Sequence, residues 1–390
     1  MASEQREKER LERKLKKSKK KRAAAWIIIG VVVAALLIMR IAEIDFSSIR
    51  DGSAFSSVSS RDSGYPYGLS TGSDVYFGSV DGDVCILEDS AYTVLDSSDA
   101  EVRLNFDHGY SNPVIKTAGS YSLLYDQGGL SYRLDSGDEN IYQEKAQEQL
   151  LCAGVSDSGT VVLATTSQDS LSTVYVYNRS LKQKFSFGVT DGYVTGVAVD
   201  SRGSRVAFAA VSSENARFKT VVYTMSIDDS KPRAQFEYVG SSVLELRFSS
   251  TDLFVVGNDF VSVIDSLKNE KKVYGQGTVG LVSYSFTNDG SLIYAYTAYS
   301  GSADNNISVV KPSGKVTEVA STGSAVKDVT GDSKRISVLT AESVITYKIS
   351  NSKVLAECQV DDSYSSIQQI SSHVFARHQA VVELLAGEQE

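Results

Sequence analysis

Few residues of this 390-residue chain combine the side chains and the spacing that catalysis needs. An active site brings together a nucleophile, a base or a set of metal ligands. His108 lies in a predicted loop, while His373 and His378 are five residues apart in a predicted strand and are expected to face opposite sides of it. The sequence has no HExxH, G-x-S-x-G or CxxC pattern and no glycine-rich phosphate-binding loop. We therefore assign no catalytic, cofactor-binding or metal-ligating residue from the sequence.

Two acidic segments remain as candidates for binding an ion. Asp135–Asn140 and Asp81–Asp83 each place several oxygen donors close together, as Ca²⁺ prefers. Neither follows the EF-hand spacing, and Asp and Gly are also ordinary residues of tight turns. Turn formation is the favoured interpretation, with calcium binding as its alternative.

Cysteine and tyrosine are both interpreted as packing residues. Cys85, Cys152 and Cys358 are odd in number and far apart, so they form no disulfide framework and are expected to be small buried side chains.

Most of the 21 tyrosines lie in strand-like runs, where packing is favoured over a surface that binds glycans or peptides. Examples are Tyr175, Tyr177, Tyr284, Tyr294 and Tyr296.

The elements that would position any site are short β-rich runs that recur along the chain. The segments Leu150–Val155, Asp157–Gly159 and Val161–Ala164 form a predicted strand, turn and strand. The Gly permits the positive φ that a short hairpin turn needs. Similar units begin near residues 113, 194, 243, 281, 326 and 367, so neighbouring starts are 37 to 49 residues apart. Third and fourth strands follow in most units, which predicts a four-stranded module repeated along the chain.

This repeat predicts an all-β fold, a β-propeller of four-stranded blades. The unit from Asp74 to Asp107 and those that follow it give eight blades, with seven as the alternative. The last unit, from Ile367 to Leu385, is one strand short. Tyr65–Ser70 precedes the first unit and could supply that strand, and ring closure would leave no exposed sheet edge.

One apolar run separates a basic tail from the rest of the chain. Ala23–Met39 has no charged residue, and as a helix it would span about 26 Å, so we predict a transmembrane helix over residues 23–42. Trp26 fits an interfacial anchor. The residues expected to contact lipid are Trp26, Ile27, Ile28, Ile29, Val31, Val32, Val33, Leu36, Leu37, Ile38 and Met39.

Charge on the two sides of this run predicts its orientation. Residues 1–22 contain eleven Lys or Arg and four Glu, whereas the chain after residue 41 has 27 basic and 44 acidic residues. A basic flank stays in the cytoplasm, so the C-terminal part is expected outside the plasma membrane. A cleaved signal peptide is the alternative, but the run is long and lacks a small-residue cleavage site. The residues expected to set the topology are Lys16, Lys17, Lys19, Lys20, Lys21 and Arg22.

The predicted organisation is therefore a cytoplasmic tail (1–22), a transmembrane helix (23–42), a Ser-rich stalk (43–63), an extracytoplasmic propeller (64–386) and a short C-terminal tail (387–390). This order resembles an uncharacterised family of membrane-anchored proteins from anaerobic Gram-positive bacteria. The segments that carry the resemblance are Gly109–Lys116 and Tyr125–Gly129. The resemblance implies a location on a bacterial envelope and assigns no activity or functional residue. Quinone-dependent propellers differ because their blades carry Trp, and the WD dipeptide of WD40 repeats is also missing.

We expect the propeller to act as a binding or scaffolding module at the cell envelope. The expected partners are membrane lipid, through the helix and basic tail, and a protein or cell-wall component that contacts the propeller. No nucleic acid is expected, since the basic tail has no interleaved aromatic residues and adjoins a membrane helix. An envelope enzyme, for example one acting on glycans at the mouth of the channel, is the alternative, because carboxylates from distant blades could meet there unseen by sequence motifs. A function confined to the basic tail is disfavoured.

Overall fold

Eight antiparallel sheets of four strands each make up the part of the chain that the computed structural model describes, which is residues 64–70, 76–214, 217–265, 268, 270–274, 280–297, 302 and 304–387. The expectation of eight blades is confirmed, and the alternative of seven is wrong. Within the described ranges no helix is long and apolar enough to cross a membrane. The predicted helix at 23–42 and the basic cluster at 16–22 lie outside the described residues.

The first four blades begin at residues close to those predicted from the repeat. Blade 1 consists of β2 (Tyr76–Val80), β3 (Asp83–Leu87), β4 (Ala91–Leu95) and β5 (Val102–Asp107). Blade 2 consists of β6 (Pro113–Ala118), β7 (Tyr121–Asp126), β8 (Ser131–Ser136) and β9 (Glu139–Lys145). Blade 3 consists of β10 (Leu150–Val155), β11 (Val161–Thr166), β12 (Ser172–Tyr177) and β13 (Gln183–Val189). Blade 4 consists of β14 (Tyr193–Val199), β15 (Arg205–Glu214), β16 (Arg217–Ser226) and β17 (Ala234–Val239).

The remaining blades repeat the pattern, and the last takes one strand from the N-terminal side. Blade 5 consists of β18 (Val243–Ser249), β19 (Asp252–Gly257), β20 (Val261–Asp265) and β21 (Glu270–Tyr274). Blade 6 consists of β22 (Gly280–Phe286), β23 (Leu292–Thr297), β24 (Asn305–Val310) and β25 (Val316–Thr322). Blade 7 consists of β26 (Val326–Gly331), β27 (Arg335–Thr340), β28 (Ser343–Lys348) and β29 (Val354–Gln359). Blade 8 consists of β30 (Tyr364–Ile370), β31 (His373–His378), β32 (Val381–Gly387) and β1 (Tyr67–Gly68).

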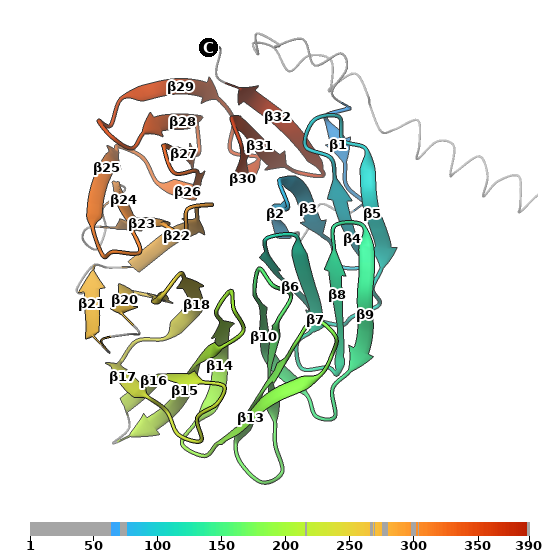
Figure 1. The fold of residues 1–390 in the computed structure, drawn as a ribbon. Coiled ribbons are helices and arrows are strands. Elements are labelled where there is room, and N and C mark those ends of the chain that lie inside the picture. The colour runs from blue at the N-terminus through green and yellow to red at the C-terminus, as the bar shows by residue number, and fades with distance from the viewer. Residues whose placement is uncertain are drawn as a thin grey trace, which may run out of the picture. The chain divides into compact units, whose positions relative to one another are not determined.

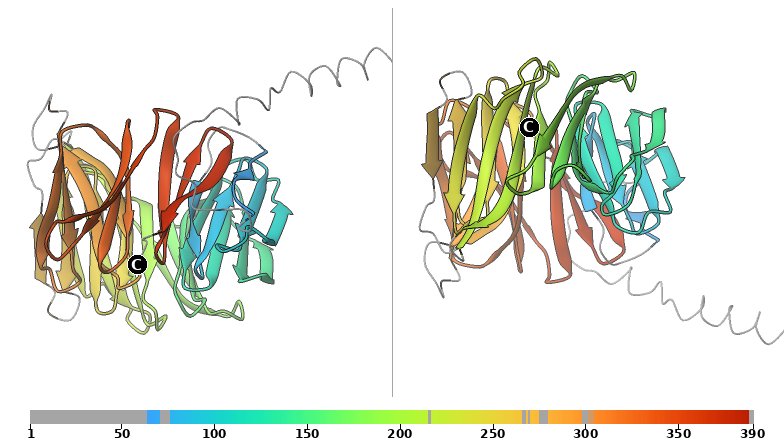
Figure 2. Two further views of the ribbon diagram at one scale, coloured as in Figure 1. Left: turned by 90° about the horizontal axis from the view of Figure 1, so that it is seen from above. Right: turned by 90° about the horizontal axis from the view of Figure 1, so that it is seen from below.

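The blades surround a central axis, with the first strand of each blade innermost and the fourth at the rim (Figure 1). In the two views turned by 90° the strands run through the thickness of the ring, so strand ends and turns form its two faces (Figure 2). The Asp-x-Gly turns behave as predicted, because Gly159 and Gly290 have φ of +73° and +76°. A side chain at Gly290 would also collide with Ser249 of the neighbouring blade. Glycine there serves both the turn and the contact between blades.

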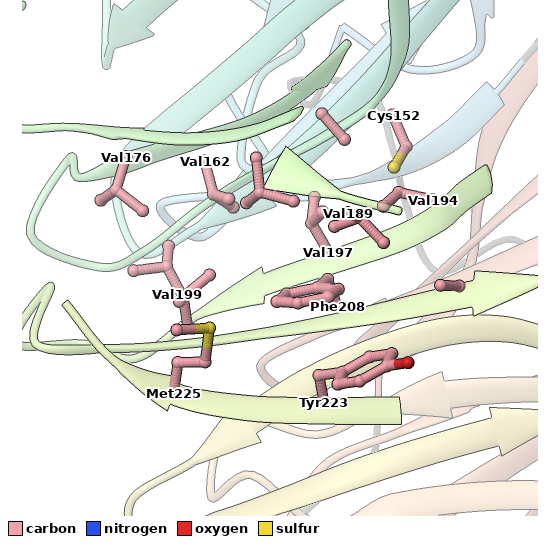
Figure 3. Close-up of a cluster of buried hydrophobic side chains, with 14 of the residues drawn as sticks. Cys152, Val162, Val176, Val189, Val194, Val197, Val199, Phe208, Tyr223 and Met225 are labelled. Atoms are coloured by element: carbon pink, nitrogen blue, oxygen red, sulfur yellow. The ribbon is translucent and has the colours of Figure 1, made fainter. Parts of the chain in front are cut away.

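Buried apolar side chains form eight clusters, one between each pair of neighbouring blades. The cluster between blades 3 and 4 includes Val162, Val176, Phe208, Tyr223 and Met225 (Figure 3). The Phe208 and Tyr223 rings stack with centroids 4.9 Å apart. Each sheet therefore buries both of its faces, which explains why the predicted strands read as nearly continuous apolar runs.

The two ends of the propeller pair as the sequence predicted. β1 pairs antiparallel with β32, with Tyr67 opposite Val382 and Gly68 opposite Val381. Tyr65 precedes β1 and is 5% exposed, and it packs on Phe375 with ring centroids 5.1 Å apart. Its hydroxyl donates a hydrogen bond to the backbone oxygen of Asp96 in blade 1, at 3.0 Å. Tyr65 thus joins the last blade to the first.

We expect Tyr65→Ala to lower the free energy of unfolding by about 3 to 5 kcal/mol, because it removes a fully packed ring at the closure. Tyr65→Phe keeps the ring and loses only the hydrogen bond, so it should cost about 1 kcal/mol. Urea unfolding followed by circular dichroism measures both. Tyr193→Ala is the matched control, since Tyr193 is 56% exposed and its loss should change stability by less than about 0.5 kcal/mol. Equal effects of Tyr65→Ala and Tyr193→Ala would contradict a closure stabilised by Tyr65.

Candidate functional site

The central channel holds a cavity of about 840 Å³. It is lined by the first strands of blades 1 to 6 and by the turns that follow them. Small residues such as Gly154 and Gly196 occur where these strands converge. A side chain on Gly154 would approach the Val197 carbonyl oxygen to 3.2 Å, so the glycine lets blades 3 and 4 meet closely at the axis. The cavity is the place where side chains from distant parts of the chain meet.

A charged contact crosses this cavity. The ammonium of Lys116 on β6 lies 3.1 Å from Oε2 of Glu245 on β18, and the Tyr284 hydroxyl on β22 donates to the same oxygen at 3.1 Å. Arg247, two residues after Glu245, stacks its guanidinium over the Phe286 ring at 4.8 Å. Blades 2, 5 and 6 are therefore joined through one carboxylate.

The surroundings keep Glu245 ionised. Burial alone would raise its pKa, but the positive charges of Lys116 and Arg247 and the two hydrogen bonds outweigh burial and lower the pKa. Burial and the nearby Glu245 charge together raise the pKa of Tyr284, so its hydroxyl stays protonated and donates. An ionised, paired carboxylate of this kind is a poor general acid. Its clearest role is to bridge the blades and give the channel a polar wall.

A second carboxylate links the first strands of blades 6, 7 and 8. Asp328 on β26 accepts hydrogen bonds from Ser283 Oγ at 2.8 Å and from the Ile367 backbone N–H at 2.9 Å. Burial raises the pKa of Asp328 to about 6, although these hydrogen bonds favour the ionised form. Asp328 therefore titrates near neutrality while it holds three blades together.

The histidines have structural contacts. His108 is buried, accepts a hydrogen bond at Nδ1 from the Tyr110 N–H and donates from Nε2 to the Glu88 carbonyl, both at 3.0 Å. His373 and His378 are the first and last residues of β31. His378 stacks on Tyr364 with centroids 4.7 Å apart and lies 3.7 Å from Glu383. The structure does not bring His108 together with the other two.

In each of the two acidic segments considered for calcium, one carboxylate is engaged within the protein. Asp135 is buried and forms an ion pair with Arg133 at 2.8 Å, and Asn140 donates to it at 2.9 Å. Asp83 lies 3.1 Å from Arg103 and accepts a hydrogen bond from Ser97 N–H at 3.3 Å. Among the residues that the structure describes, no three His, Cys, Asp or Glu side chains form a group that could hold a metal ion. The favoured interpretation, turn formation, agrees with these contacts.

The cysteines are free thiols with suppressed reactivity. Cys85 and Cys152 are buried as predicted, whereas Cys358 is only half-buried. Burial raises the pKa of Cys85 and Cys152 to about 12 and that of Cys358 to about 11. Because the thiolate is the nucleophile, these side chains are inert at neutral pH.

The tyrosines pack largely as predicted, with two that lie near Glu245. Tyr294 is buried, and its ring stacks on Tyr296 with centroids 5.4 Å apart. Tyr284 instead reaches Glu245 in the channel, and Tyr76 on β2 lies within the electrostatic reach of the same carboxylate. Sequence reasoning missed Lys116, Glu245 and Tyr284, because Lys116 and Glu245 are 129 residues apart and belong to no motif.

We expect the stability contributed by Asp328 to fall as pH rises from about 4 to about 6. Its pKa in the folded chain is above the ordinary 3.8, so the folded state holds the proton more tightly and ionisation destabilises it. Asp328→Asn removes this titration. At each pH, the variant's unfolding free energy is subtracted from that of the natural chain. This difference should be roughly 2 to 3 kcal/mol smaller at pH 7 than at pH 4. Urea unfolding at a series of pH values measures this, and parallel curves would contradict it.

Solved structures share the fold of this chain. The yeast Saccharomyces cerevisiae protein Sqt1 is 10% identical with a TM-score of 0.60, and the match covers 83% of this chain and 98% of Sqt1. The C-terminal WD40 domain of Sif2 is 11% identical with a TM-score of 0.58, covering 83% and 99% of the two chains. The computationally designed protein Ika8 is 12% identical with a TM-score of 0.57, covering 82% and 98%. At these identities the likeness shows the propeller fold and nothing of function.

Sequence comparison identifies the family. No curated protein matches the chain. A family model does match, over residues 52–382, a range that includes the first seven blades, most of blade 8 and both segments on which the resemblance to an uncharacterised family rests. The chain therefore belongs to the family of unknown function DUF5711.

Proposed function

We propose that this chain is a single-pass membrane protein whose propeller is a non-enzymatic module that binds a protein partner at the bacterial cell envelope. The observation that carries the binding role is the closed ring, in which eight buried interfaces fix the turns of two broad faces. A preorganised surface of this kind loses little conformational entropy when a partner binds. The likeness to the WD40 domain of Sif2 supports the proposal through the shared fold.

The sequence supports the membrane anchor and its orientation. The uncharged run Ala23–Met39 is long enough to cross a bilayer, and the basic residues precede it. In this proposal the tail at 1–22 is cytoplasmic and the propeller lies outside the plasma membrane. Anionic lipid of the inner leaflet would contact the Lys-rich end of the tail.

An envelope enzyme remains the second candidate because the channel cavity contains an ionised carboxylate. Glu245 lies in a space of about 840 Å³ beside Lys116 and Tyr284. Glycoside hydrolysis, however, uses two carboxyl groups that flank the bond to be broken. Asp81, Asp157 and Asp289 also line the cavity, at turns after the first strands of blades 1, 3 and 6, but the contact at Glu245 is made with Lys116 and Tyr284 and not with a second carboxylate. We therefore favour binding.

Protease added to intact cells should degrade the propeller, because the proposed orientation places it outside. Replacing the six residues Lys16, Lys17, Lys19, Lys20, Lys21 and Arg22 with Glu should reverse this result, since the charge bias that keeps the tail inside is lost. The control changes the five lysines to Arg, which keeps the charge and should keep the propeller accessible. Blotting with an antibody to the propeller measures the outcome. A natural chain that is protected in intact cells and cleaved after lysis would contradict the proposed topology.

Cross-linking in the native envelope should capture the same protein partner with the natural chain and with Glu245→Gln. This result is expected because a scaffold does not depend on a channel carboxylate. In parallel, the purified full chain in detergent should release no reducing sugar from peptidoglycan. The enzyme alternative would replace the binding proposal if two results were found together. The natural chain would release sugar and Glu245→Gln would not, and neither chain would capture a protein.

A further inference from the structure

The two faces of the ring are distinguished by which turns they carry. At one face the first strand of each blade begins, and the connections between blades and the turns between second and third strands lie there. We call it the connection face. The other carries the turns between first and second strands and between third and fourth strands. We call it the tether face, because Gly64, the residue through which the chain reaches β1, lies against Asp99 in the β4–β5 turn.

Among the described loops of the connection face, acidic residues occur in many and Lys or Arg in none. Its described connections between blades contain Glu148, Asp191, Asp361 and Asp362. Its described turns between second and third strands contain Glu88, Asp89, Asp169, Asp259, Asp304 and Glu342. No Lys or Arg occurs in any of these described loops. The loops therefore carry ten negative charges without a basic residue among them.

The tether face is nearly neutral. Its described turns hold eleven acidic residues and ten Lys or Arg, the latter including Lys182, Arg202, Lys231, Lys311, Lys315 and Lys353. The acidic excess of the propeller loops is thus concentrated on one side of the ring. A one-sided charge distribution of this size selects partners of opposite sign and speeds their association.

Exposed apolar side chains lie on the same acidic face. Leu171, Tyr193, Phe218, Val239 and Leu244 follow one another from blade 3 to blade 5, and Tyr193 and Val239 are 56% and 58% exposed. On the tether face the exposed large apolar residues among those described are Val102, Val316 and Val354, which belong to three separate blades. Grouped exposed apolar side chains mark interaction sites in soluble domains.

Backbone hydrogen bonds and strand register show how these residues lie relative to one another. The Leu171 N–H donates to the Val189 carbonyl at 3.0 Å, and the next residue, Ser172, accepts at Oγ from the Val194 N–H at 3.0 Å. Leu171 of blade 3 is therefore adjacent to Tyr193 of blade 4. The Gly240 N–H donates to the Phe218 carbonyl at 2.9 Å. Tyr193, Val211 and Thr220 are successive register partners, so Tyr193 and Phe218 point to one face of the blade 4 sheet, whereas Val239, opposite Lys219, points to the other.

We propose that the connection face over blades 3 to 5 is a docking surface for a basic protein segment that also carries apolar side chains. Lys and Arg of the segment pair with the acidic loops, and its apolar side chains cover Tyr193 and Phe218, which share one face of blade 4. The inference rests on the proposed binding function and specifies its face and the chemistry of its partner. An anionic lipid surface or an anionic cell-wall polymer does not fit, because the described loops at blades 3 to 5 contain Glu148, Asp169, Asp191 and Asp259 and no Lys or Arg.

The test measures fluorescence anisotropy of a labelled twelve-residue peptide of alternating Lys and Leu with the full chain in detergent. The expected result is saturable binding that weakens as salt rises and that is absent for a Glu/Leu peptide and much weaker for a Lys/Ser peptide. The double variant Tyr193→Ser with Phe218→Ser, and separately Asp169→Asn with Asp191→Asn, should each weaken binding at least about fivefold.

The matched controls lie on the tether face. Val316→Ser with Val354→Ser, and Asp138→Asn with Asp228→Asn, change exposed residues of the same kinds and should leave binding within about twofold. Equal weakening by both sets would show attraction to the overall negative charge alone and would overturn the docking surface. So would a lack of binding by the Lys/Leu peptide.

A second measurement separates this inference from the proposed function. A photo-cross-linking amino acid at Tyr193 should capture, in the native envelope, a protein segment rich in Lys and Arg, whereas one at Val354 should not. Capture from Val354 alone would leave the binding module standing and overturn the choice of face. Capture from neither position would overturn both.

Discussion

Burial of both faces of every sheet is the constraint on which this structure depends. Each blade is a four-stranded sheet, and an apolar cluster separates it from the next blade on either side. A single blade of this composition would expose residues such as Val162 and Phe208, so it gains stability only when its neighbours cover it. A row of blades still leaves two uncovered faces, and closing the ring removes them. The pairing of β1 with β32 and the packing of Tyr65 on Phe375 accomplish this closure.

Closure also brings the first strands of the blades together at the axis and determines what the channel contains. Six first strands with small residues enclose a space of about 840 Å³ that is lined by Lys116 and Glu245, and Tyr284 of a third blade hydrogen-bonds to Glu245. A charge in that space must be paired, because burial raises the cost of leaving it alone. Glu245 is paired, and Asp328 is held by Ser283 and by backbone N–H groups. These carboxylates act as bridges between blades, and their position at the axis follows from the geometry of the ring.

A rigid ring with two unlike faces is suited to binding. The strands run through the thickness of the ring, so every turn belongs to one face or the other (Figure 2). Turns can vary in sequence with little effect on the buried interfaces, which leaves their charge free to serve recognition. The acidic connection face and the nearly neutral tether face illustrate this separation. The buried clusters provide stability, and the turns provide the surface that a partner meets.

The sequence alone determined the repeat, the strand starts and the closing strand. Alternation of apolar runs with turns such as Asp157–Gly159 is a local property, since each strand and hairpin is specified by neighbouring residues. The missing strand of the last unit could be inferred because an unpaired edge is unfavourable, and Tyr67–Gly68 supplies it. The membrane helix and its orientation are likewise local predictions, and they concern residues outside those described.

Only the tertiary structure decided which distant side chains meet and which share a face. Lys116 and Glu245 are 129 residues apart, and nothing near either one in the sequence indicates the other. Tyr193 and Phe218 are isolated apolar residues near turns in the sequence, and the strand register of blade 4 places them on one face of the sheet. The acidic residues of the connection loops are also scattered along the sequence among turns that carry Lys and Arg. Their segregation depends on the up-and-down course of the strands, which sends alternate turns to opposite faces, and on the closed ring that fixes each blade beside its neighbours.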